Sequence, residues 1–348
     1  MTTTVMTRPA ESAVKQRSCQ ALFPVGEDCG NGALKLATSL GESRLDSYIV
    51  YTKERLSLGL TAGYVEYLEG DRDDLIGKQW IGGINAYYHA PNAVLRVTDD
   101  RYGKVDLGLQ LLLSAVSLMP HRDEWHLSIA SSVHDGPVLG KGVKAAKEGR
   151  HQVRFNNRDT VVNIEVCAVL EEGTGAVIHY QKQADFTNAI VYDLGNGTLI
   201  YSHFIGLAMS DRGYSDGGGV ESLIDAIACN PIVREKLLKE GDRHLIRAGI
   251  EATKFTYGTQ YPGWHFADAY KQALPAWVNT VLKPLLRKAE TATDSATALI
   301  AIGGGACLPG IVKLLSKRNI KVLPDPQWAN VRGLYAYARN YVAKQEVK

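Results

Sequence analysis

The sequence predicts a mixed α/β protein with two pseudo-symmetric halves around a cleft. Two similar strand–turn–strand units lead to this prediction, one beginning at Asp28 and the other at Asp193. A third observation is an apolar strand, Ala298–Ile302, that runs directly into three glycines. With 348 residues, 45% of them hydrophobic, the chain is long enough to bury two domain cores.

Composition narrows the classes of partner and the compartment. The formal net charge is only +2, so no large single-sign field is available to hold nucleic acid directly. Five scattered cysteines, an odd number without metal-ligand spacing, indicate a reducing cytoplasm. Residues 1–17 have no apolar run of the kind that a signal peptide or a transmembrane segment needs, and we expect a flexible extension there.

The first half should be rich in strands. Apolar residues at Cys19–Val25 and Ala33–Thr38 predict two strands, joined by a glycine-rich turn over residues 26–32. Pro24 is unusual in such a strand because proline cannot donate a ladder hydrogen bond. Irregular β structure is expected over residues 47–103, followed by a helix at Leu107–Leu118. Further strands are expected at Trp125–Ser131, Gln152–Asn156, Val161–Leu170, Ala176–Tyr180 and, as a strand–turn–strand unit, Ala189–Phe204.

The second half changes to a helical period. Four helices are predicted at Val220–Ala228, Ile232–Glu240, Arg243–Ala252 and Phe266–Ala289. Pro284 should kink the last of them because proline removes an interior hydrogen bond. After the strand that ends at Ile302, shorter helices are expected at Gly310–Ser316 and Asn330–Tyr341.

The two strand–turn–strand units carry the same string, Asp-x-Gly-Asn-Gly. Glycines let a turn direct its backbone N–H groups at a phosphate, and an aspartate at a strand end can hold Mg²⁺ through its waters. Taken singly, each string is also what an ordinary hairpin turn would use; the repetition favours phosphate binding. The predicted phosphate ligands are Gly30, Asn31, Gly32 and Lys35 in the first unit and Gly195, Asn196, Gly197 and Thr198 in the second, with Asp28 and Asp193 as phosphate-proximal metal ligands.

The three glycines after Ile302 form the third element. Gly303, Gly304 and Gly305 would allow the backbone to approach a flat base or a sugar closely. A tight strand-to-helix turn without any ligand is the alternative. A separate triple glycine at residues 217–219 precedes a predicted helix and is either part of the site or a flexible loop.

These motifs, in this order, resemble the actin, DnaK-type chaperone and sugar-kinase superfamily, and within it the ParM-type bacterial actins. Ile190–Gly195 is similar to their second phosphate hairpin, Ile302–Ala306 to their base-binding glycines, and Trp328–Gly333 to a C-terminal Phe-Ala-Asn-x-x-Gly segment. The resemblance implies an actin-like (ribonuclease H-like) ATPase fold. It also implies one domain of residues 18–186 with 322–348 and a second of residues 187–321.

The same resemblance implies a function and its residues. Glu171, with Glu172 in reserve, would position the attacking water, and Asp193 would act with it at the site of hydrolysis. ATP or GTP with Mg²⁺ would be the cofactors. The protein would assemble head-to-tail into cytoskeletal filaments in the cytoplasm. A DNA-binding adaptor of the ParR type would link such filaments to a plasmid. A filament that sets cell shape, or a small-molecule kinase of the sugar type, are the alternatives.

Overall fold

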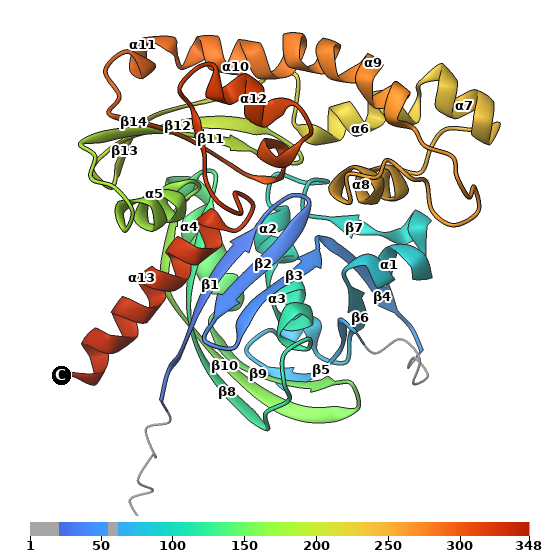
Figure 1. Ribbon diagram of the computed structural model, residues 1–348. Helices are drawn as coiled ribbons and strands as arrows, with labels where there is room; N and C mark the ends of the chain where they lie inside the picture. The colour runs from blue at the N-terminus through green and yellow to red at the C-terminus, as the bar shows by residue number, and fades with distance from the viewer. Residues whose placement is uncertain (1–20, 55–61, 348) are drawn as a thin grey trace, which may run out of the picture.

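The computed structural model describes residues 21–54 and 62–347, so the predicted extension and Cys19 lie outside the described residues. Two sheets divide this part of the chain, a ten-stranded sheet from the first half and a five-stranded sheet from the second (Figure 1). No described helix is both long and apolar enough to cross a membrane.

The ten-stranded sheet has the order β3-β2-β1-β8-β10-β9-β5-β6-β4-β7. Strands β1, β8 and β10 are parallel neighbours, and the other pairings are antiparallel. The strands are β1 Phe23–Cys29, β2 Ala33–Thr38, β3 Gly41–Asp46, β4 Tyr48–Thr52, β5 Tyr64–Gly70, β6 Gln79–Gly82, β7 Leu95–Arg96, β8 Glu124–Val133, β9 Gly149–Phe155 and β10 Arg158–Glu171.

The five-stranded sheet repeats the first part of that plan. Its order is β13-β12-β11-β14-β15, with an antiparallel β11–β12 hairpin followed by two parallel neighbours, as in β3-β2-β1-β8-β10. The predicted pseudo-symmetry is therefore present in the strand order. These strands are β11 Asn188–Leu194, β12 Leu199–Ile205, β13 Ala208–Tyr214, β14 Ala298–Ile302 and β15 Lys321–Val322.

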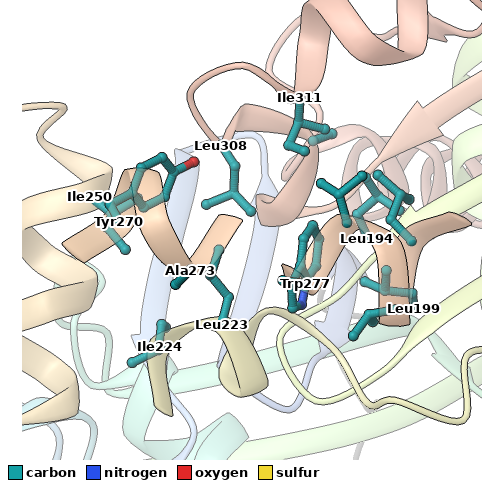
Figure 2. Packing of buried hydrophobic residues seen from close by; sticks show 14 of the residues in the cluster. Leu194, Leu199, Leu223, Ile224, Ile250, Tyr270, Ala273, Trp277, Leu308 and Ile311 are labelled. Carbon is teal, nitrogen blue, oxygen red and sulfur yellow. The ribbon is translucent and has the colours of Figure 1, made fainter. Parts of the chain in front are cut away.

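Helices cover both sheets. The helices, with 3-10 and π turns labelled η, are α1 Ile84–His89, α2 Gly103–Asp106, α3 Gly108–Val116, α4 Gly136–Lys147, α5 Thr174–Gln181, α6 Val220–Ala228, α7 Pro231–Leu237, α8 Arg243–Glu251, α9 Ala267–Trp277, η3 Val278–Leu282, α10 Lys283–Lys288, α11 Glu290–Thr293, α12 Ile311–Ser316 and α13 Ala329–Glu346, with η1 Asp73–Leu75, η2 Pro91–Ala93 and η4 Gly304–Cys307. Helices α6 to α12 bury the outer face of the smaller sheet. Figure 2 shows Trp277 of this layer near Leu194 and Leu199, which flank the β11–β12 turn.

Helices α5 and α13 join the two halves at their centre. Buried residues of α5 pack on the smaller sheet, and α13 packs on β1 and β8 of the larger one. The two helices touch where both carry glycine: a Cβ on Gly333 would lie 1.7 Å from the carbonyl oxygen of Gly175. Gly26 of β1 gives α13 similar room, since its Cβ would lie 2.4 Å from the oxygen of Val331.

Several predicted elements differ from the structure. The predicted strand at Ala176–Tyr180 was wrong, because these residues form α5: its buried face has no neighbouring strand to pair with and packs on α13 and the sheet. Strand β1 continues through Asp28 to Cys29, so the first turn is shorter than predicted. Pro24 is accommodated because β2 pairs with β1 only from Gly26 onward. The long helix is interrupted by a π turn, η3, directly before α10, which carries Pro284 in its first turn.

The glycine contact between α5 and α13 predicts that a glycine-to-alanine substitution lowers the stability of the protein at residue 333 but raises it at residue 140. Gly333→Ala should destabilise the protein by about 2 kcal/mol or more, because the methyl group cannot fit against Gly175 without separating the helices. Gly140→Ala in α4 is the matched control; its Cβ would meet nothing closer than 3.8 Å, so helix propensity should stabilise the protein by up to about 1 kcal/mol. Urea unfolding of both variants measures this, and equal effects would contradict the packing argument.

Candidate nucleotide-binding site

A cavity of about 510 Å³ lies where the two halves meet. Its lining contains thirteen of the fourteen predicted site residues and omits only Glu171: Asp28, Gly30, Asn31, Gly32, Lys35, Asp193, Gly195, Asn196, Gly197, Thr198, Gly303, Gly304 and Gly305 belong to the wall, together with Glu172. The volume is within the range of small-molecule sites. The structure therefore brings the three glycine motifs together in one cavity.

The two glycine turns face each other inside this cavity. A Cβ on Gly197 would lie 2.5 Å from Nδ2 of Asn31, and a Cβ on Gly32 would lie 3.0 Å from Cβ of Asn196. Each asparagine therefore lies against a glycine of the opposite turn. This reciprocal contact favours glycine in both turns. A hairpin turn in isolation would have no such facing side chain and would not need glycine for this reason.

The second turn is fixed by the start of α6. The N–H groups of Val220 and Glu221 donate to the carbonyl oxygens of Gly195 and Asn196, at 3.1 and 2.8 Å. Gly219 allows this approach, because its Cβ would lie 2.4 Å from the oxygen of Asn196. The triple glycine at residues 217–219 thus has a packing role, and the second turn is held by a helix whose N-terminus points at it.

The first carboxylate of the site, Asp28, is well compensated. Lys35 lies opposite it in the β1–β2 ladder and donates to its Oδ2 at 3.1 Å. Nδ2 of Asn330, from the Trp328–Gly333 segment, donates to Oδ1 at 3.1 Å. Burial alone would raise the pKa of Asp28, but Lys35 and Asn330 outweigh it and hold the pKa below its usual value.

The second carboxylate, Asp193, has the equivalent position in the other sheet but the opposite environment. Its partner across the β11–β12 ladder is Ile200, so no cation stands where Lys35 stands for Asp28. Burial, together with the negative charges of Glu172 and Asp28, raises the pKa of Asp193 to about 7. The site therefore has an uncompensated carboxylate that a bound cation would stabilise.

The three glycines after β14 have different surroundings. Gly303 has φ +84°, and a Cβ on it would lie 2.5 Å from Oδ1 of Asp193, so this position requires glycine. A Cβ on Gly305 would lie 2.7 Å from the oxygen of Leu194, whereas Gly304 has no atom near its Cβ position. Gly303 and Gly305 thus pack against the end of β11, and Gly304 has open space beside it in the cavity wall.

The structure reverses the order of the two glutamates. Glu172 lines the cavity, while Glu171 lies outside its lining. The carboxylate of Glu171 is already occupied: it accepts from the N–H of Gly136 at 2.9 Å and from Arg212 at 2.8 Å. The resemblance to ParM-type proteins favoured Glu171, and the local pattern Glu-Glu does not itself say which carboxylate faces inward. The roles of both remain predictions.

Arg212, which the sequence analysis did not identify, clamps this region from the other sheet. Its guanidinium donates to Glu171, to the carbonyl oxygen of Glu172 at 2.8 Å and to the carbonyl oxygen of His134. The Arg212 side chain is only 6% exposed. A buried guanidinium that donates to three acceptors of the first half fixes the backbone from which Glu172 points into the cavity.

Two further cavity residues were also missed. Lys104, on α2, is ion-paired with Glu172, and His134 follows β8. Burial and the positive charge of Lys104 lower the pKa of His134, so its imidazole is neutral near pH 7. Neither residue belongs to a recognisable local motif, so no local signal in the sequence could have found them.

Contacts also cross the mouth of the cavity. Arg44 forms a two-pronged ion pair with Glu251 at 3.1 and 3.2 Å, and Tyr87 donates to Asp242 at 2.7 Å. Figure 1 shows α8, which carries Glu251, beside α1 and β7. These contacts join the outer parts of the two halves around the opening.

Comparisons with known proteins identify the fold. No protein-family model and no curated protein matches this sequence. Its structure, however, is similar to Bacillus thuringiensis ParM with ATP, at 16% identity and a TM-score of 0.68, over 94% of this chain and 100% of that one. The archaeal actin homologue Ta0583 matches at 17% identity and a TM-score of 0.67, over 92% and 100%.

A third similar structure is a 15-stranded ParM filament from Clostridium botulinum, at 14% identity and a TM-score of 0.65, over 92% of this chain and 99% of that one. The chain has an actin-like fold. The predicted fold class, with two pseudo-symmetric halves, is thereby confirmed. In this actin-like fold the predicted domain boundaries, and the roles of the site residues, remain proposals.

The contrast between the two aspartates predicts opposite pH-dependent effects on stability. A carboxyl group whose pKa is raised by folding stabilises the folded state at low pH, and this contribution is lost as the pH rises toward about 7. Asp193→Asn should therefore stabilise the free protein at pH 8 by about 1 kcal/mol or more, with a smaller gain at pH 5.

Asp28→Asn is the matched control, and its effect should have the opposite sign. The lowered pKa of Asp28 means that its charge stabilises the fold above the unfolded-state pKa, so the variant should lose stability at pH 8. Thermal unfolding across pH 5–8 measures both effects. A destabilised Asp193→Asn protein at pH 8 would contradict the uncompensated charge.

Proposed function

We propose that this protein is a nucleoside triphosphatase that binds ATP or GTP with Mg²⁺ in the cavity and polymerises head-to-tail into filaments. The observation that carries the proposal is the reciprocal contact of the two glycine turns, with Asp28 and Asp193 at the adjacent strand ends. The actin-like fold supports it, because the similar structures include a ParM with ATP and a ParM filament.

The cavity residues fit a phosphate chain. Backbone N–H groups of the glycine turns and the ammonium group of Lys35 are suitable donors for phosphate oxygens. At the other end of the wall, Ile224, Ile250 and Leu308 lie with Gly304 and offer apolar surface to a base. Nothing in this lining selects adenine over guanine.

The same residues fit Mg²⁺. The described residues contain no group of three or more His, Cys, Asp or Glu side chains able to hold a metal, so Asp28 and Asp193 would share the ion with phosphate oxygens and water. Burial and the negative charges of Glu172 and Asp28 around Asp193 favour a bound cation there. Bound Mg²⁺ would neutralise charge on the phosphate oxygens.

Glu172 would hold and orient the attacking water. Its carboxylate faces the cavity, and Arg212 holds its backbone from the opposite sheet. Little covalent chemistry is needed from the protein, because positioning and charge stabilisation account for most of phosphoryl-transfer catalysis. The neutral imidazole of His134 is a second group that could orient water in this part of the wall.

Identical subunits that contact one another head-to-tail form an open filament when the contacts do not close into a ring. A filament of this kind could carry plasmid DNA through a DNA-binding adaptor of the ParR type, in keeping with the nearly balanced charge of the chain itself. Plasmid segregation is the finer part of the proposal.

Assembly can be tested directly. Purified protein with Mg²⁺ and ATP or GTP should scatter light, pellet on ultracentrifugation and form filaments in electron micrographs, whereas protein with EDTA should remain in the supernatant. A folded protein that stays monomeric with both nucleotides, and binds neither, would refute the proposal.

Hydrolysis distinguishes the two neighbouring glutamates. Glu172→Gln should slow phosphate release by about 100-fold while preserving assembly, since a positioned acid–base group contributes roughly 10²- to 10⁴-fold. Glu171→Gln is the matched control; it should lower thermal stability, because Arg212 loses a charged partner, but leave hydrolysis closer to wild type. The reverse result would restore Glu171, the choice made from the sequence.

A further inference from the structure

Among the described residues, Lys104 is the most buried cation of the cavity wall whose carboxylate partner also lines the cavity. Its side chain is 7% exposed and that of Glu172 is 15% exposed, and the two form an ion pair. Burial opposes the charge of Lys104, but Glu172 and then Cys29 and Asp28 outweigh it, so the pKa is raised and the ammonium group stays protonated.

The neighbours of Lys104 place it at the phosphate end of the cavity. It is close enough to lower the pKa of both Asp28 and Asp193, the carboxylates at the ends of β1 and β11. Lys35 is already committed to Asp28 at 3.1 Å. Lys104 is therefore the second lysine of this region, and it forms an ion pair with Glu172.

We propose that Lys104 is a phosphate-sensing and positioning residue: it holds Glu172 in the free protein and donates to the terminal phosphate of a bound nucleoside triphosphate. This inference rests on the proposed function, since it uses the same cavity and the same glutamate. A group that orients water against the terminal phosphate must lie within a few ångströms of it, and a lysine in direct contact with that group has the same reach.

A bound triphosphate would compete with Glu172 for the hydrogen-bond donors of Lys104. With nucleotide absent, the ammonium group of Lys104 is the hydrogen-bond donor to Glu172, which keeps one carboxylate oxygen occupied. A terminal phosphate offers a second strong acceptor and would share the donors of Lys104, which has three. A diphosphate lacks that acceptor, so Lys104 should distinguish triphosphate from diphosphate.

The test is the ratio of the two affinities, measured by calorimetry with Mg²⁺ and either a non-hydrolysable ATP analogue or ADP, below the concentration at which the protein assembles. Lys104→Met should weaken triphosphate binding about tenfold or more and leave diphosphate binding nearly unchanged, because a hydrogen bond to a charged group contributes about 1.5–3 kcal/mol. Lys104→Arg should restore much of the ratio.

Two controls keep the outcome interpretable. Lys144→Met removes an exposed lysine that pairs with Glu148 outside the cavity lining, and should not change the ratio. Because Lys104→Met leaves Glu172 without its cation, the double variant Lys104→Met/Glu172→Gln is compared with Glu172→Gln alone, and should again bind triphosphate more weakly.

An unchanged ratio in a folded Lys104→Met protein, or an equal loss for both nucleotides in both comparisons, would overturn the inference. Wild-type protein that binds neither nucleotide would instead refute the proposed function, so the two failures are distinguishable.

Discussion

The contact between the two glycine turns is the constraint on which the site depends. Asn31 and Asn196 each lie against a glycine of the opposite turn, so a larger side chain at Gly32 or Gly197 would require the facing asparagine to move. The turns are anchored separately, one through β1 and α13 and the other through α6. Their separation therefore depends on how the two halves are docked, and any change of docking alters the cavity between them directly.

Because the two halves are pseudo-symmetric, the electrostatic difference between Asp28 and Asp193 can be traced to one position in the ladder of each hairpin. The ladder position that holds Lys35 beside Asp28 holds Ile200 beside Asp193. Two carboxylates of equal position thus have pKa values shifted in opposite directions, one lowered and the other raised to about 7. A lysine at both ladder positions would have placed a cation beside each aspartate, whereas the single ladder lysine, Lys35, leaves Asp193 without such a neighbour.

Local strings made the fold and most of the cavity predictable, and long-range contacts account for what was missed. Glycine, aspartate and asparagine in the two turns carry their conformational signal within a few residues. The choice of Glu172 over Glu171 depends on Arg212, forty-one residues from Glu171 along the chain. Lys104 pairs with Glu172, which is sixty-eight residues away along the chain. Helix α5 contains Val177 and Tyr180, residue types that favour strands, but burial against α13 makes this segment a helix.

The contacts between the halves differ in strength from the back of the cavity to its mouth. At the back, Arg212 is 6% exposed and holds three acceptors of the first half. At the mouth, Arg44–Glu251 and Arg96–Glu221 are ion pairs with side chains between 30% and 50% exposed, and such pairs typically contribute under about 1 kcal/mol each. Opening is thus least costly at the mouth, with the Arg212 clamp as the fixed side. A ligand that touches both turns could then shift the halves with a differential affinity of only a few kcal/mol.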